Sequence, residues 1–129
     1  MPGIADYKAG RYKIAIQKLD AYLVQHPYTV SNHTWPSASA TAGQYLGKAY
    51  LNDHQDQKAI DTFSNSYISN AHNTYWIGIA LMDQGKLSEA RTAFKRSIEM
   101  SSKGDAGWES AADEKINEID YIESQHVRR

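Results

Sequence analysis

Small and hydrophobic residues recur every three or four positions along most of the chain, with polar and charged residues between them. This spacing places the apolar side chains on one face of a helix and predicts a series of amphipathic helices. Gly85 and Gly104 stand where two of these patterns stop, as glycine does just after many helices. The pattern therefore predicts an all-α chain, with helices at residues 4–9, 12–25, 37–52, 56–69, 71–84, 87–101 and 105–125.

Part of this pattern repeats within the chain. The segment 10–15 recurs as the segment 85–90, each with a glycine turn followed by the start of a helix that carries an alanine. The spacing between a small residue of one helix and a small residue of the next is also repeated, as expected where two antiparallel helices pack closely. The matched pairs are Gly47 with Ala59 and Gly78 with Ala90.

The repeated segments carry a known residue pattern, W-x2-L-G-x2-Y followed by A-x3-F, which belongs to the tetratricopeptide repeat (TPR). The matching positions are Gly43, Leu46, Gly47, Tyr50, Ala59 and Phe63 in one stretch, and Thr74, Ile77, Gly78, Leu81, Ala90 and Phe94 in the next. The chain therefore resembles the TPR family. The resemblance implies a right-handed α-solenoid of about three helix-turn-helix units with a C-terminal capping helix.

The resemblance also implies the layout of the chain, a single TPR domain over residues 1–129. The first unit keeps only the second half of the pattern, and an insertion makes the spacing from Ala15 to Ala59 about ten residues longer than a standard unit. The expected parts are unit one at about 1–27, an insertion at 28–37, unit two at about 38–70, unit three at about 71–104 and the capping helix at 105–125.

In the TPR family, the first helices of successive units line a concave groove, and residues of the repeat pattern itself pack in the core. By register, the groove positions here are Gln44, Lys48, Leu51, Asn52, Tyr75, Ile79, Met82 and Asp83. Exposed aromatic and methionine side chains beside lysine and asparagine suit the binding of a peptide or helix of another protein. The alternative is that these side chains are solvated or partly covered by the tail helix.

Trp35 lies in the insertion at 28–37 and is a candidate loop contact with a partner. Long loops that carry an aromatic residue are often functional, because they project from the scaffold. The alternative, which is favoured, is that Trp35 folds back over an exposed helix end.

Charge and composition narrow the class of function. Hydrophobic residues make up 41% of the chain and charged residues 22%, with a formal net charge of −1. Because the basic residues form no stripe, nucleic acid is not an expected partner, and RNA binding through related helical repeats is an unfavoured alternative. The chain has no cysteine, and its five histidines show no metal-ligand spacing. No catalytic or cofactor-binding motif occurs, so the sequence predicts neither an enzyme nor a metal or cofactor site.

The sequence thus predicts a non-catalytic protein-interaction module, an adaptor, scaffold or assembly factor that holds a peptide or helix in its groove. An alternative is an oligomerisation or regulatory fragment of a larger TPR-containing protein, with self-association through the N-terminal face. No membrane span or signal peptide is expected, which favours a cytoplasmic location. The periplasm, as the site of an envelope assembly factor, remains the alternative if an export signal has been removed.

Overall fold

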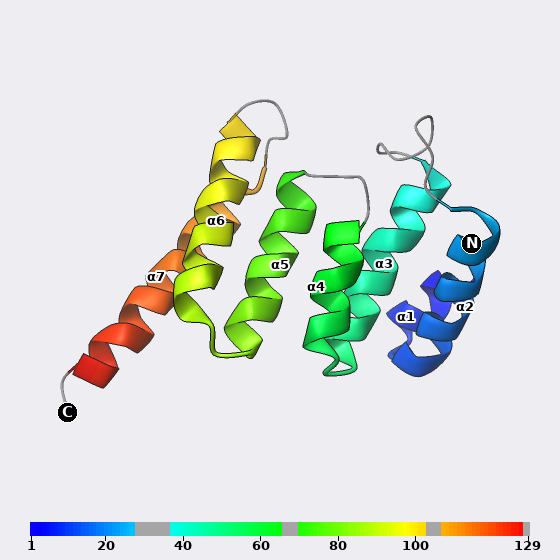
Figure 1. Cartoon of the computed structure of the whole chain (residues 1–129), viewed down its shortest axis with the longest axis horizontal. Coiled ribbons are helices and arrows are strands. Elements are labelled where there is room, and N and C mark those ends of the chain that lie inside the picture. Colours follow the sequence, from blue (N-terminus) through cyan, green and yellow to red (C-terminus); the bar gives the residue numbers. More distant parts are fainter. Residues whose placement is uncertain (28–36, 66–69, 103–106, 128–129) are drawn as a thin grey trace. The chain divides into compact units, whose positions relative to one another are not determined.

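The computed structural model describes residues 1–27, 37–65, 70–102 and 107–127. Across these residues the chain forms helices and no strands, which confirms the predicted all-α class. The chain divides into two compact units, Met1–Ser69 and Asn70–Arg129. The helices are α1 (Ile4–Lys8), α2 (Tyr12–Gln25), α3 (Ala38–Asn52) and α4 (Asp56–Asn65) in the first unit, and α5 (Ala71–Asp83), α6 (Leu87–Ser102) and α7 (Glu109–Val127) in the second (Figure 1).

The helix boundaries agree closely with the sequence pattern where side chains cap the ends. The Ser37 hydroxyl accepts a hydrogen bond from the Ala40 N–H at 3.0 Å, and Asn70 caps α5 in the same way. The prediction was wrong at the start of the last helix, which begins at Glu109 instead of residue 105. Gly107 adopts a left-handed backbone (φ 111°), and the Trp108 N–H donates to the Ser101 hydroxyl at 3.0 Å. Both features keep this segment out of the helix.

One turn geometry joins the helices of three hairpins, α1–α2, α3–α4 and α5–α6. In each, the residue two positions after the helix end has a left-handed backbone, with φ angles of 82° at Gly10, 60° at His54 and 77° at Gly85. Each turn is closed by the two backbone bonds of a Schellman motif. Their longer-range members are Arg11 N–H to Asp6 O at 2.8 Å, Gln55 N–H to Tyr50 O at 2.9 Å, and Lys86 N–H to Leu81 O at 2.9 Å.

Close contact between a glycine and a larger side chain also recurs in the three hairpins. A Cβ atom placed on Gly47 would lie 2.5 Å from the Phe63 ring, and one placed on Gly78 would lie 2.6 Å from the Phe94 ring. In the first hairpin, Gly3 takes the same position against Leu19, at 2.8 Å. The helices can approach this closely only because the first partner has no side chain.

The core of the first unit is built by α2 and α3. Ala15 and Leu19 of α2 are fully buried against Ala42, Leu46 and Ala49 of α3. Small residues dominate the contact, so the two helices pack at short range. In addition, Asp6 of α1 is 7% exposed and forms ion pairs with Lys18 at 2.8 Å and with Arg11 at 2.9 Å.

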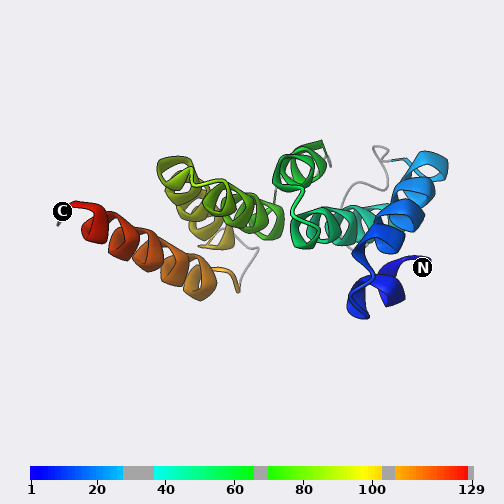
Figure 2. The ribbon, with the colours of Figure 1, turned by 90° about the horizontal axis from the view of Figure 1, so that it is seen from below.

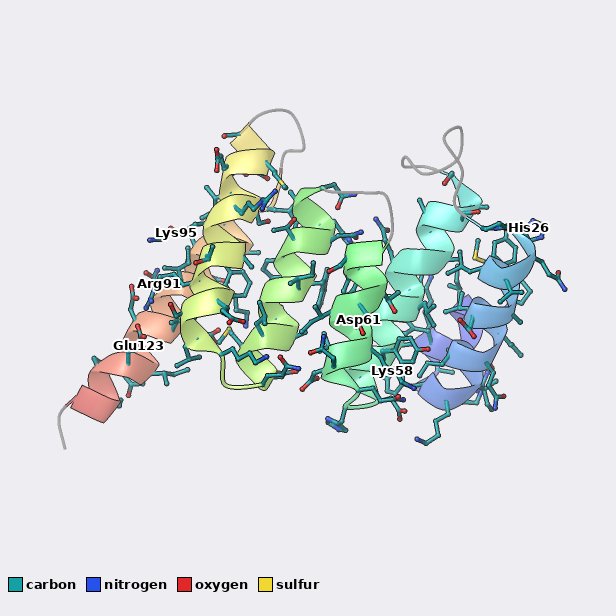
Figure 3. All side chains as sticks on the ribbon, in the orientation of Figure 1. His26, Lys58, Asp61, Arg91, Lys95 and Glu123 are labelled. Carbon is teal, nitrogen blue, oxygen red and sulfur yellow. The ribbon has the colours of Figure 1, made fainter. Side chains whose placement is uncertain are left out.

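In the second unit, α5 packs against α6, and α7 lies alongside α6 (Figure 2). Phe94, Ala112 and Ile119 are fully buried in its core. On the surface, Arg91 of α6 pairs with Asp120 at 2.8 Å and with Glu123, both on α7 (Figure 3). Apolar packing and this charged contact together attach the last helix.

Candidate protein-binding groove

The eight residues predicted to line a groove fall in both units, four in each. Gln44, Lys48, Leu51 and Asn52 lie on α3 of the first unit, and Tyr75, Ile79, Met82 and Asp83 lie on α5 of the second. In each half, one residue is buried, two are half-buried and one is exposed.

On α3, Lys48 and Asn52 make contacts within the unit. Leu51 is 7% exposed, so the expectation of an exposed side chain at this position is wrong. Gln44 and Lys48 are half-buried and Asn52 is exposed. The Asn52 amide donates to the Lys48 carbonyl at 2.8 Å and lies 3.5 Å from the Tyr7 hydroxyl.

An aromatic cluster surrounds these polar groups. The rings of Tyr7 and Tyr45 meet edge to face with centroids 5.4 Å apart, and the Lys48 ammonium lies 5.7 Å from the Tyr45 centroid. Burial lowers the pKa of Lys48 and raises the pKa of Tyr7. Asn52 thus links α3 to Tyr7 of α1, whereas Lys48 contacts Tyr45 of its own helix.

On α5, the expectation that Tyr75 is exposed was wrong. Its side chain is 8% exposed and packs against Phe94 of α6 and Trp108, with ring centroids 5.5 Å and 5.2 Å away. Burial raises the pKa of the Tyr75 hydroxyl. The alternative expectation, that the tail covers this position, agrees with the contact between Tyr75 and Trp108. Ile79 is half-buried against the same core, while Asp83 is exposed.

An open groove of about 630 Å³ lies where Met82 of α5 faces α7. It is lined by Met82, Glu114, Lys115, Asn117, Glu118, Tyr121 and Ile122. Met82 is the one predicted residue among these. The sequence pattern missed Tyr121 because it stands next to, and not within, the apolar stripe of α7; its exposure of 66% appears only when the helix is packed.

The groove combines apolar side chains with acidic ones. Lys115 forms an ion pair with Glu118 at 2.9 Å, which raises the pKa of Lys115 and keeps it charged at neutral pH. Glu114 is exposed beside this pair, so the charged side chains of the lining carry a net negative charge. Surfaces with apolar anchors and a charged border are suited to binding another protein.

Two further sequence hypotheses concern other sites. Trp35 and residues 28–36 around it lie outside the described residues. Among residues 1–27, 37–65, 70–102 and 107–127, no group of three or more His, Asp or Glu side chains could hold a metal ion. Within the same residues, no helix has the length and apolar character that crossing a membrane requires.

The chain matches no model of a known protein family, and comparison with curated protein sequences also finds no match.

Proposed function

We propose that this chain is a non-catalytic protein-interaction module that binds a peptide or helix of a partner in the groove between α5 and α7. The observation that carries the proposal is the open groove of about 630 Å³, with Met82, Tyr121 and Ile122 as apolar contacts. The lining is a row of α7 side chains with Met82 of α5 beside it, and apolar contacts among polar neighbours suit a short peptide or an amphipathic helix.

Tyr121 is the proposed anchor of the site. Its side chain is 66% exposed, whereas tyrosine side chains in folded proteins are usually more buried. Tyrosine contributes large contact area for little loss of side-chain freedom, and it is enriched among the residues that dominate binding energy. Glu114 and Glu118 on the same helix would fix the orientation of a partner through its charges.

The repeated construction supports a TPR-type repeat protein. Each of the three hairpins has a Schellman turn of the same geometry. In each, a glycine in or just before the first helix contacts a large side chain of the second helix. We propose that the hairpins stack as a right-handed α-solenoid, for which small-angle X-ray scattering provides the test: a compact globule would contradict it.

The proposed compartment is the cytoplasm, with the periplasm as alternative, and fractionation of cells that carry the tagged gene distinguishes them.

The binding site is tested with peptides selected against the chain. A displayed library of helical peptides is selected on the immobilised wild-type protein, and the selected peptides are titrated into the ¹⁵N-labelled chain. Amide shifts are expected at Met82 and along residues 114–122. Tyr121→Glu should weaken binding by about tenfold or more, because it removes the anchor and adds charge.

Lys95→Glu provides the matched control, since Lys95 lies exposed on α6 (Figure 3). It should bind the selected peptides as the wild type does. Equal binding by the Tyr121→Glu variant, with amide shifts confined to other helices, would overturn the groove assignment.

The alternative function is an oligomerisation or regulatory part of a larger TPR-containing protein, including an envelope assembly factor. The observation that favours an oligomerisation role is the exposure of Ile14 and Val24 on α2, at 42% and 76%.

A further inference from the structure

In the described part of the chain, the exposed large hydrophobic side chains gather in two places. Met1, Ile14 and Val24 belong to the N-terminal hairpin, and Tyr121 belongs to α7. The first place is in one unit and the second is in the other.

On α2, the exposed apolar residues form a stripe. Ile14, Gln17, Ala21 and Val24 follow one another at three- and four-residue spacings, and all four are exposed. Residues with this spacing share one face of a helix. The opposite face of α2 carries the buried Ala15 and Leu19, so the stripe points away from the core of its unit.

Basic side chains border this stripe. Lys13 and Lys18 lie on its two sides and keep 82% and 50% of their side chains exposed, although each pairs with an aspartate of its own unit. Over residues 1–27 the sequence has Lys8, Arg11, Lys13 and Lys18 against Asp6 and Asp20, an excess of positive charge.

The α5–α7 groove has the opposite charge. The helix α7 carries Glu109, Asp113, Glu114, Glu118, Asp120 and Glu123 against Lys115 within its bounds. Arg91 pairs with Asp120 and Glu123, but Glu114 and Glu118 lie in the groove, where Lys115 compensates one of them. The groove thus offers Tyr121 and Met82 within an acidic border.

From this complementarity we propose that the occupant of the groove is the α2 stripe of a second copy of the chain. Val24 and Ile14 of one copy would lie against Tyr121 and Met82 of the next, with Lys13 and Lys18 facing Glu114 and Glu118. The inference rests on the proposed function, because it uses the same groove. It adds the identity of the partner.

The two contacting surfaces are different, and this fixes how the assembly grows. A contact between unlike faces leaves one free copy of each face at the two ends, so it extends into chains unless it closes into a ring. The apolar contact is small, so association should be weak and should weaken further with salt, which screens the charges.

Sedimentation of the purified chain from about 10 µM to about 1 mM tests the assembly. The weight-average mass should rise from 14.5 kDa at the lowest concentration to twice that value or more at the highest, with a smaller rise at high salt. A mass that stays at 14.5 kDa throughout overturns the inference.

Two charge variants identify the faces. Lys13→Glu with Gln17→Glu makes the α2 stripe acidic, and Glu114→Lys with Asn117→Lys makes the groove basic; all four positions are exposed. Each variant alone should remain a monomer, because like charges then meet. An equimolar mixture should associate again, because basic and acidic faces are paired once more. A mixture that stays monomeric, or a variant that associates as the wild type does, overturns the assigned faces.

Peptide titration separates this inference from the proposed function. A chain that is monomeric at all concentrations yet binds selected peptides through residues 114–122 has a groove for another protein, and only the self-association is overturned. A monomeric chain whose groove also binds no peptide overturns both. Lys95→Glu should associate as the wild type does, which controls for the general effect of a new acidic side chain.

Discussion

The ring of Phe63 lies directly on the backbone of Gly47. A Cβ atom on Gly47 would come within 2.5 Å of the ring, a distance that Cβ contacts essentially never show. Gly78 and Phe94 repeat the arrangement in the second unit, at 2.6 Å. In both hairpins the glycine therefore fixes how closely two antiparallel helices approach.

Replacing this glycine should destabilise the hairpin. Gly47→Ala is expected to cost about 1–3 kcal/mol of unfolding free energy, because the Phe63 ring must shift in a packed core. Chemical denaturation measures the change. Combining Gly47→Ala with Phe63→Leu should recover part of the loss, since leucine is the residue that faces Gly3 in the first hairpin. Additive effects of the two substitutions would contradict direct contact as the cause.

Much of this architecture could be predicted from the sequence, because the hairpin repeat uses residue types that a pattern reveals. Alanines at matching spacings marked the second helices, and Ala15, Ala59 and Ala90 are all fully buried. Gly3 was missed as the counterpart of Gly47. It precedes a helix of five residues, too short to show a period, although its distance to Gly47 equals that from Ala15 to Ala59.

His54 offers a second prediction about the repeated turn. It has a φ angle of 60°, where the other two hairpins have Gly10 and Gly85. A left-handed backbone costs a residue with a side chain about 1 kcal/mol, and glycine avoids most of this cost. His54→Gly should therefore raise the unfolding free energy by up to about 1 kcal/mol, as measured by thermal or chemical denaturation. Gly85→Ala should lower it, and a stabilised Gly85→Ala variant would contradict this view of the turn.

The binding residues were harder to predict than the core, and Tyr75 and Tyr121 show why. Tyr75 lies on the first helix of the predicted unit three, and Tyr121 lies on the predicted capping helix. The repeat register places Tyr75 on a groove face. The position of α7 decides otherwise, because Trp108 comes from a segment distant in sequence and covers Tyr75. Exposure depends on how helices pack, and a period within one helix does not contain that information.

These two tyrosines should respond differently to substitution. Tyr75→Ala is expected to cost about 3 kcal/mol or more in unfolding free energy, since it leaves a cavity beside Phe94 and Trp108. Tyr121→Ala should change stability by about 0.5 kcal/mol or less, because the side chain is 66% exposed. Denaturation curves of both variants, recorded at a low protein concentration, measure the difference. Equal losses of stability would place Tyr121 in the core and remove it from the proposed site.

The ion pairs of Asp6 predict how stability changes in acid. Hydrogen bonds from Lys18 and Arg11 lower the pKa of Asp6 below its ordinary value of 3.8. A carboxyl group with a depressed pKa in the folded state stabilises the fold above its unfolded pKa, and this contribution is lost as the pH falls through the folded pKa. The wild-type unfolding free energy should therefore decline below about pH 4, and Asp6→Asn should decline less steeply over the same range while being less stable at pH 7. Denaturant titrations from pH 7 to pH 2 measure both curves.

Asp113→Asn, at an exposed position of α7, serves as the control and should keep the wild-type pH dependence of the unfolding free energy. Parallel curves for the wild type and Asp6→Asn would show that Asp6 does not contribute to this pH dependence.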